Sequence, residues 1–202
     1  MSRTFNLAWR YSWSADPDAC IDRALELATA AIRHDDLDAR AHAELAYAHL
    51  YRKEHKAALA AYERALELNP NDADIIAEYA DALVYVDQPQ RSIALLERAM
   101  RLNPYHPDWY LWYLADAYHV LRQPENVIAT IQKMRDPSEG RRLLAASYAH
   151  LGKLDEAQLQ ARELLRVHPN FTVSSWAKRP PYHNREGLEY YLEGLRKAGL
   201  PE

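Results

Sequence analysis

Two stretches of the sequence, ERALELNPNDAD at Glu63–Asp74 and ERAMRLNPYHPD at Glu97–Asp108, are near-copies that lie 34 residues apart. A third, more distant copy, RELLRVHP, ends at Pro169. Self-similarity at a fixed period of roughly 20 to 50 residues is typical of proteins built from stacked structural repeats. The same offset pairs residues upstream of these stretches, matching Ala58, Tyr62, Ala65 and Pro70 with Ser92, Leu96, Ala99 and Pro104.

The small residues and the prolines have a physical reason. Two antiparallel helices pack closely only where small side chains let their backbones approach, and a proline ends the second helix because it has no amide hydrogen. Ala46, Ala58 and Ala65 are the small residues of the first clear copy, and Pro70 ends it. The spacing therefore predicts a repeated helix-turn-helix unit. This unit resembles the tetratricopeptide repeat (TPR), and the resemblance implies an all-α, right-handed superhelical solenoid of antiparallel helix pairs.

We expect a single TPR domain over residues 1–202, with repeats at 39–72, 73–106, 107–137 and 138–171. The third repeat is about three to four residues short, so its second helix, which opens near Pro124, should lose a turn. A degenerate repeat is expected at 5–38.

Both ends of the chain carry helix-capping signals. Asp16 is the expected N-cap of the second helix in the degenerate repeat, with Pro17 at the first helical position. After Pro169 the period ends, and residues 172–202 are expected to cap the solenoid. The final helix of this cap should begin at Asn184 and end at Gly199.

Composition narrows the class of protein. Apolar residues make up 49% of the 202-residue chain, with only 5 Gly and 2 Phe, which suits a helical core. A formal net charge of -4 argues against a general nucleic-acid binder, which needs a basic surface. The single Cys20 allows no internal disulfide and fits a reducing cytoplasm. No apolar run long enough for a membrane span or a secretory signal is present, so we expect a cytoplasmic protein.

The resemblance also predicts where a partner would bind, because the first helix of each TPR pair lines a concave groove. On the helix that follows Pro107, helical spacing places Trp109 and Trp112 on the groove face and Tyr110 and Tyr113 on the packing face. Trp and Tyr are also common packing residues in this repeat, so the alternative of core packing stays open. The predicted partner-binding residues are Trp9, Trp13, Arg40, Tyr47, Tyr51, Asp81, Tyr85, Trp109, Trp112, Asp116, His119, Arg142 and His150.

The sequence shows no sign of an enzyme. It contains no Gly-rich phosphate loop and no HExxH, CxxC or GxSxG motif, and the nine His residues are scattered. We therefore predict no catalytic residue, no cofactor and no metal site. The expected ligand is a protein or peptide, bound as an extended or helical segment with apolar and basic side chains. Self-association is a further expectation to test.

A narrower resemblance concerns the ends of the chain. The opening YSWSADPDACIDRALELATAAI, the middle NPYHPDWYLWYLADAY and the terminus LEGLRKAGLPE resemble the C-terminal TPR region of bacterial class III adenylate/guanylate cyclase-like proteins and of related winged-helix regulators. Those proteins carry an N-terminal catalytic or DNA-binding domain, which this sequence lacks. Two hypotheses follow from the sequence: an adaptor that binds a partner segment, or a regulatory half that controls a cyclase or transcription domain in cis or in trans.

Overall fold

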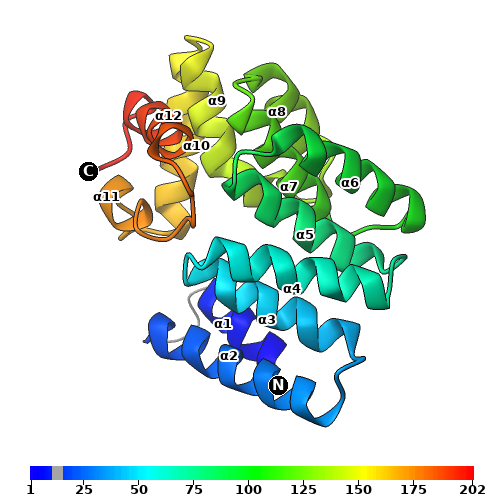
Figure 1. Cartoon of the computed structure of the whole chain (residues 1–202). Coiled ribbons are helices and arrows are strands. Elements are labelled where there is room, and N and C mark those ends of the chain that lie inside the picture. Colours follow the sequence, from blue (N-terminus) through cyan, green and yellow to red (C-terminus); the bar gives the residue numbers. More distant parts are fainter. Residues whose placement is uncertain (11–15) are drawn as a thin grey trace.

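The computed structural model describes the backbone of residues 1–10 and 16–202, and the side chains of these residues except 7–10 and 17. Within those ranges the chain is all-α, which confirms the predicted fold class. Consecutive helices form antiparallel pairs that follow one another from the N-terminus to the C-terminus (Figure 1). The helices are α1 (Ser2–Arg10), α2 (Pro17–His34), α3 (Ala39–Tyr51), α4 (His55–Leu68), α5 (Ala73–Tyr85), α6 (Pro89–Leu102), α7 (Asp108–Val120), α8 (Pro124–Ile131), a 3-10 turn (Pro137–Gly140), α9 (Arg141–His150), α10 (Leu154–Val167), α11 (Val173–Trp176) and α12 (Arg185–Lys197).

Helix starts follow the predicted local signals. Asp16 caps α2 by accepting a hydrogen bond from the amide of Ala19 at 3.0 Å, and Asn184 caps α12 by accepting from Glu186 at 3.0 Å. Both capping predictions are confirmed. The acceptor side chains satisfy amides that have no partner inside the helix, so they fix where the helix begins.

The turns inside the pairs share one backbone conformation. Lys53, Asp87, Arg122 and Gly152 all have positive φ angles, between 56° and 73°, and each lies between the first and second helix of its pair. Only Gly152 adopts this left-handed conformation without steric cost. The repeat therefore demands the same turn even where the sequence offers no glycine.

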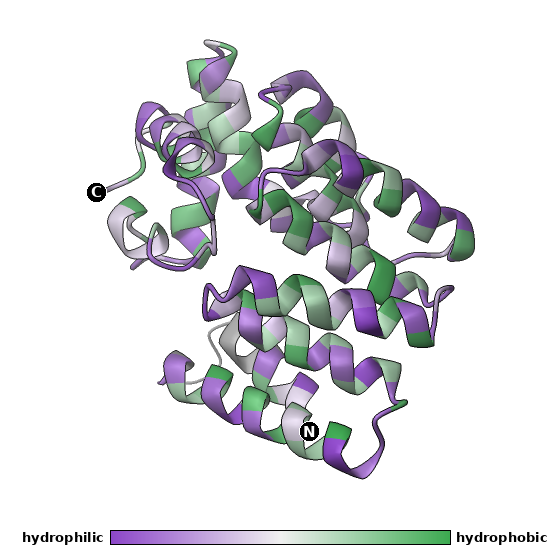
Figure 2. Ribbon diagram, viewed as in Figure 1, coloured by the Kyte–Doolittle hydropathy of each residue, from purple (hydrophilic) through white to green (hydrophobic). Residues whose placement is uncertain are grey.

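Small residues bring the helices together, as the repeat predicts. Ala46, Ala58 and Ala65 are fully buried between α3 and α4, and Ser92 and Ala99 occupy the same places in α6. Hydrophobic residues recur along each helix and are separated by hydrophilic ones (Figure 2). The apolar clusters of neighbouring repeats share partly buried residues, which makes the core continuous from α3 to α12; these are Leu66, Leu95, Met100, Trp112 and Tyr118.

Two features interrupt the regular solenoid. Helix α8 has 8 residues, whereas α4, α6 and α10 have 14 each, which confirms the predicted shortening. The C-terminal segment, residues 172–202, contains α11, an irregular stretch with Pro180 and Pro181, and α12. Helix α12 packs on α9 at very short range: a Cβ atom built on Gly194 would lie 2.7 Å from the Cβ atom of Ala146.

Candidate functional site

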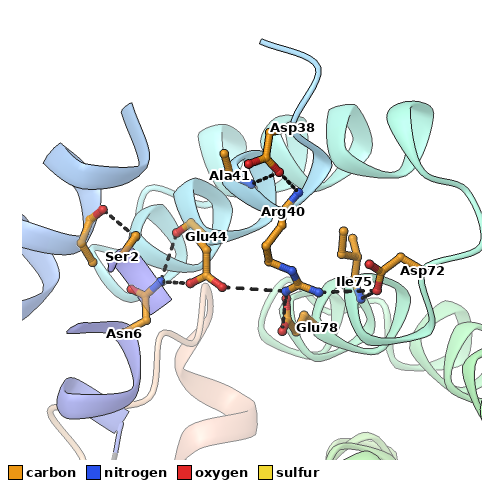
Figure 3. A network of polar contacts seen from close by, with 10 residues as sticks. Ser2, Asn6, Asp38, Arg40, Ala41, Glu44, Asp72, Ile75 and Glu78 are labelled. Carbon is orange, nitrogen blue, oxygen red and sulfur yellow. Dashed lines mark hydrogen bonds and ion pairs between the residues drawn. The ribbon is translucent and has the colours of Figure 1, made fainter. Parts of the chain in front are cut away.

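The first helices of the pairs, α3, α5, α7 and α9, carry all of the predicted partner-binding residues except Trp9 and Trp13. At the N-terminal end of this surface the predicted residue Arg40 lies in a charged network (Figure 3). One guanidinium nitrogen of Arg40 donates to both carboxylate oxygens of Glu78, at 2.9 and 2.7 Å. Glu44 lies 3.8 Å from the same guanidinium and accepts a 2.6 Å hydrogen bond from Asn6 of α1. The network thus joins α1, α3 and α5.

Burial dominates the electrostatics of this network. Removal from water raises the pKa of Glu78 to about 7, although the Arg40 charge opposes the shift. Burial likewise raises the pKa of Glu44. Neither carboxylate is among the residues predicted from the sequence. A signal was present, because the two glutamates are 34 residues apart and so occupy the same place in successive repeats.

Four tyrosine rings form a row along the middle of the surface. Tyr47 and Tyr51 of α3 have ring centroids 4.6 Å apart, and Tyr51 lies 6.5 Å from Tyr85 of α5. The fourth ring, Tyr182, belongs to the C-terminal segment and meets Tyr85 edge-on at 5.2 Å. The structure therefore brings the predicted Tyr47, Tyr51 and Tyr85 together. It adds Tyr182, which was not predicted from the sequence.

The C-terminal segment continues over α7 and α9. The imidazole of His119 lies 4.4 Å from the ring of Tyr191 and 5.1 Å from that of Tyr190. His150 stacks on Tyr190 at 3.8 Å with 7° between the planes, and its Nε2 lies 2.9 Å from the Tyr190 carbonyl oxygen. The predicted residues His119 and His150 thus lie beneath α12.

Two buried ionisable groups, Asp116 and His119, and the partly buried Arg142 lie under the segment. Burial raises the pKa of Asp116 to about 7, against the opposing effect of Arg142. Burial and the neighbouring His150 lower the pKa of His119 to about 3. The guanidinium of Arg142 lies 5.7 Å from the ring of Trp176, in cation–π contact. Among the described residues, Asp116 Oδ1 and His119 Nε2 have no hydrogen-bond partner.

The remaining predicted residues are Asp81, Trp109, Trp112, Trp9 and Trp13. Asp81 is buried, with 2% of its surface exposed. Trp109 and Trp112 are partly buried and pack against the core cluster of Tyr110 and Tyr113, so both rings contribute to packing. Trp9 and Trp13 lie outside the residues whose side chains are described.

The irregular stretch before α12 is held through its backbone and through ring contacts of Tyr182 with Tyr85 and of His183 with His55. His55 Nε2 lies 2.6 Å from the carbonyl oxygen of Pro181, and the amide of His183 donates to the carbonyl oxygen of Tyr85 at 2.8 Å. Lys53 Nζ donates to the carbonyl oxygen of Lys178 at 3.5 Å. We call the residues that receive this stretch, Lys53, His55 and Tyr85, the Tyr182 site.

Comparisons with known proteins agree with this architecture. Residues 39–72 match the family model of the tetratricopeptide repeat. The structure is similar to that of TTC0263, a thermophilic TPR protein of Thermus thermophilus, with a TM-score of 0.69 at 18% identity over 97% of this chain and 100% of the other. The chain has a tetratricopeptide-repeat fold. Among proteins of curated function, none matches the sequence.

Two further solved structures extend the comparison. PilW, a widely conserved type IV pilus biogenesis factor, has a TM-score of 0.68 at 16% identity over 98% of this chain and 89% of its own. YrrB, a TPR protein with an unusual peptide-binding site, has a TM-score of 0.55 at 24% identity over 86% of this chain and 91% of its own. These likenesses establish the fold.

The described residues contain no group of three or more His, Cys, Asp or Glu residues placed to hold a metal ion. None of the described helices is long and apolar enough to cross a membrane.

Proposed function

We propose that this chain is a non-catalytic protein-interaction module that binds a segment of a partner protein on the inner face, which we define as the predicted surface of α3, α5, α7 and α9. One observation carries the proposal: this face and the adjoining start of α4 already hold a stretch of polypeptide, residues 178–184, through backbone contacts with Tyr85 of α5, Lys53 of the α3–α4 turn and His55 of α4. A surface that satisfies carbonyl and amide groups of an irregular stretch has the chemistry needed to bind a peptide.

The fold supports the same function. YrrB, which has this fold, is a TPR protein with a peptide-binding site. In the present chain the tyrosine row of Tyr47, Tyr51 and Tyr85 supplies rigid aromatic area, which contributes strongly to binding because few rotatable bonds are lost. The inner face therefore offers both backbone partners and side-chain anchors.

A selection of random peptides displayed on phage tests the proposal. Peptides selected on the intact chain should lose about tenfold or more of their affinity for a Tyr51→Ala variant, because Tyr51 is a half-buried ring of the inner face. The matched control is Leu159→Ala, which removes a 48% exposed side chain on α10, the second helix of its pair. Calorimetry should show affinities for this control unchanged within about twofold. Peptides that bind both variants equally would place the binding surface elsewhere.

The narrower hypothesis, a regulatory half for a cyclase or a winged-helix transcription regulator, stays a prediction based on the quoted sequence segments. It is tested by reading the genomic frame upstream of residue 1 for a catalytic or DNA-binding domain. Self-association is tested by light scattering over a range of protein concentrations. A cytoplasmic location and the absence of a cofactor remain part of the proposal.

A further inference from the structure

We propose that residues 178–184 act as a built-in ligand of the inner face, and that the partner segment has the same chemistry: a basic, extended stretch with proline directly before tyrosine. The partner therefore binds by displacing the chain's own segment from the Tyr182 site. This inference rests on the proposed function, and it adds to it the chemical class of the ligand and the reason why the site is covered.

The polar contacts of the stretch with the Tyr182 site all involve its backbone groups. Of its polar contacts with the Tyr182 site, the His55 contact reaches the Pro181 carbonyl, the Lys53 contact reaches the Lys178 carbonyl, and the Tyr85 carbonyl receives the His183 amide. Backbone groups such as these are offered by any extended peptide, so they carry affinity rather than sequence preference. A free peptide with the same backbone path can make the same contacts.

Pro180 and Pro181 are a reason to expect proline in the partner segment. Pro180 and Pro181 fix their own φ angles and disfavour helical geometry at the preceding residues, which keeps the stretch extended before it binds. A ligand that is extended in the free state loses less conformational entropy on binding than a flexible one. Pro181 is itself buried, so the ring also contributes contact area.

Tyr182 supplies the side-chain specificity. Its ring completes the tyrosine row, in edge-on contact with Tyr85 at 82° between the planes. Such edge-on geometry places the positive ring edge against the negative face of its neighbour, and an aliphatic side chain cannot reproduce it. The carboxylates of Asp116 and Asp81 lie near enough to Tyr182 to add to the effect of burial, and together they raise its pKa well above the ordinary value. The site therefore favours a neutral phenol.

The stretch is basic whereas the chain as a whole is acidic, which favours a basic ligand. Residues 177–185 carry three positive side chains, Lys178, Arg179 and Arg185, and no negative one, whereas the chain as a whole has a formal charge of -4. Lys178, Arg179 and Arg185 are all exposed. Basic residues in the partner would thus be attracted to this acidic chain over a distance of about one Debye length, and added salt would weaken that attraction.

The built-in ligand can leave without dismantling the fold. Residues 178, 179, 183 and 184 are exposed, and the anchoring contacts of α12 on His150 and His119 lie beyond them in the sequence. A tethered ligand competes at a high effective concentration, so it keeps the site covered even when its intrinsic affinity is modest. The apparent affinity for a competing partner equals the intrinsic affinity multiplied by the fraction of sites that are open.

The test uses a fluorescent peptide with the sequence of residues 177–185, AKRPPYHNR. Anisotropy should show that it binds full-length Tyr182→Ala about tenfold or more tightly than the wild-type chain, because the variant's own stretch no longer fills the ring site. Adding His55→Ala to that variant should weaken the peptide again, since the contact with the Pro181 carbonyl is lost. The same peptide with Ala in place of Tyr is the ligand control, and it should bind the Tyr182→Ala chain at least about tenfold more weakly.

A second measurement needs no variant. In the wild-type chain, saturating peptide should increase the rate of hydrogen exchange at the amide of His183, which is bonded to Tyr85 while the stretch is in place. For the anisotropy experiment, circular dichroism and thermal unfolding first establish that Tyr182→Ala and the double variant with His55→Ala are folded.

Four outcomes would overturn the inference. They are equal binding of the peptide to wild type and Tyr182→Ala, equal binding of the tyrosine and alanine peptides, unchanged exchange at His183, and sedimentation showing that the stretch is exchanged between two copies of the chain. None of these would refute the proposed function, because that function is tested separately by whether phage-selected peptides lose affinity for Tyr51→Ala. If instead the selected peptides ignore Tyr51, the proposed function fails as well.

Discussion

Tyr62 and Tyr110 are both fully buried, yet only one of their hydroxyl groups has a hydrogen-bond partner among the described residues. Tyr110 donates to Asp74 at 2.7 Å, whereas the Tyr62 hydroxyl has no such partner. A buried hydroxyl without a partner loses its hydration and gains nothing in return. The Tyr110→Phe variant should therefore lower the free energy of unfolding by about 1 kcal/mol, and Tyr62→Phe should leave it unchanged or raise it by up to about 1 kcal/mol.

Urea unfolding of the two variants, followed by circular dichroism, measures the difference. Each change removes one oxygen atom from a fully buried ring, so the two variants are matched in size and burial. Equal destabilisation by both would mean that the Tyr62 hydroxyl is hydrogen-bonded in solution.

Gly152 is the one glycine among the four positive-φ turn residues inside the helix pairs. A Cβ atom at this position would meet nothing within 4 Å, so any cost of adding one comes from the φ angle of 73°. Gly152→Ala should lower the free energy of unfolding by about 1 kcal/mol. Lys53→Ala is the control, because Lys53 already has a side chain in the same conformation, and its stability should change by less than about 0.5 kcal/mol. A loss in the control as large as that in Gly152→Ala would refute the conformational explanation.

At the scale of helices, the close packing of α12 on α9 depends on Gly194. Its Cβ position lies 2.7 Å from the Ala146 Cβ and 2.7 Å from the His150 Nε2, so a larger side chain has no room. Gly194→Leu should separate α12 from α9 and break the stacking of His150 on Tyr190. Limited proteolysis should then cut within 178–197 at least about tenfold faster than in wild type.

Glu193→Leu is the matched control for this variant. It introduces the same side chain one residue earlier, at an exposed position of α12 that pairs only with Lys197 among the described contacts. Its proteolysis rate should stay within about twofold of wild type. If Gly194→Leu is cut no faster than this control, α12 is not held by the close approach seen here.

Helix boundaries were predictable, because they depend on local chemistry. Asp16, Asn184 and the short third repeat each carry their signal within a few residues of the feature that they determine. The docking of the C-terminal segment was not predictable in the same way. Pro180 and Pro181 exclude a helix, but the contact of Pro181 with His55 joins residues 126 positions apart, and no periodicity marks either partner.

The same distinction applies to the candidate site. The repeat period and helical spacing place Tyr51, Tyr85 and His150 on the first helices of their pairs, since a helix face follows from residue spacing. Tyr182 and Tyr190, which cover them, lie outside the repeats, so the period gives no register for them. The charged network around Arg40 depends on which of several nearby carboxylates lies closest, and that depends on the angle between α3 and α5.

At the scale of the whole molecule, two buried groups have opposite effects on stability as the pH changes. Burial raises the pKa of Asp116 from its ordinary value of 3.8 to about 7, so the folded state holds the proton more tightly and stability falls as the pH rises through this window. Burial lowers the pKa of His119 from 6.5 to about 3, so stability falls as the pH drops below 6.5. Between about pH 4 and 6.5 the two effects oppose each other.

Asp116→Asn removes one of the two effects. The variant should be more stable than wild type at pH 8, where Asp116 is charged and buried, and its stability should fall more steeply than that of wild type between pH 6.5 and pH 4. Thermal unfolding at several pH values measures both changes. Glu97→Gln, at an exposed position of α6, is the control and should follow the wild-type curve. A variant curve parallel to wild type would show that Asp116 is not a buried proton acceptor.

One backbone hydrogen bond affects how the C-terminal segment can move. The amide of Val173, at the start of α11, donates to the carbonyl oxygen of Pro201 at 2.8 Å, and Val173 is itself buried in the core. Residues 173 to 201 are therefore a closed loop whose two ends meet on the solenoid. Such a loop opens by moving residues 178–184 outward while both ends remain fixed, instead of fraying from its last residue. A domain or tag fused after Glu202 would for this reason leave the exchange between covered and open states largely undisturbed.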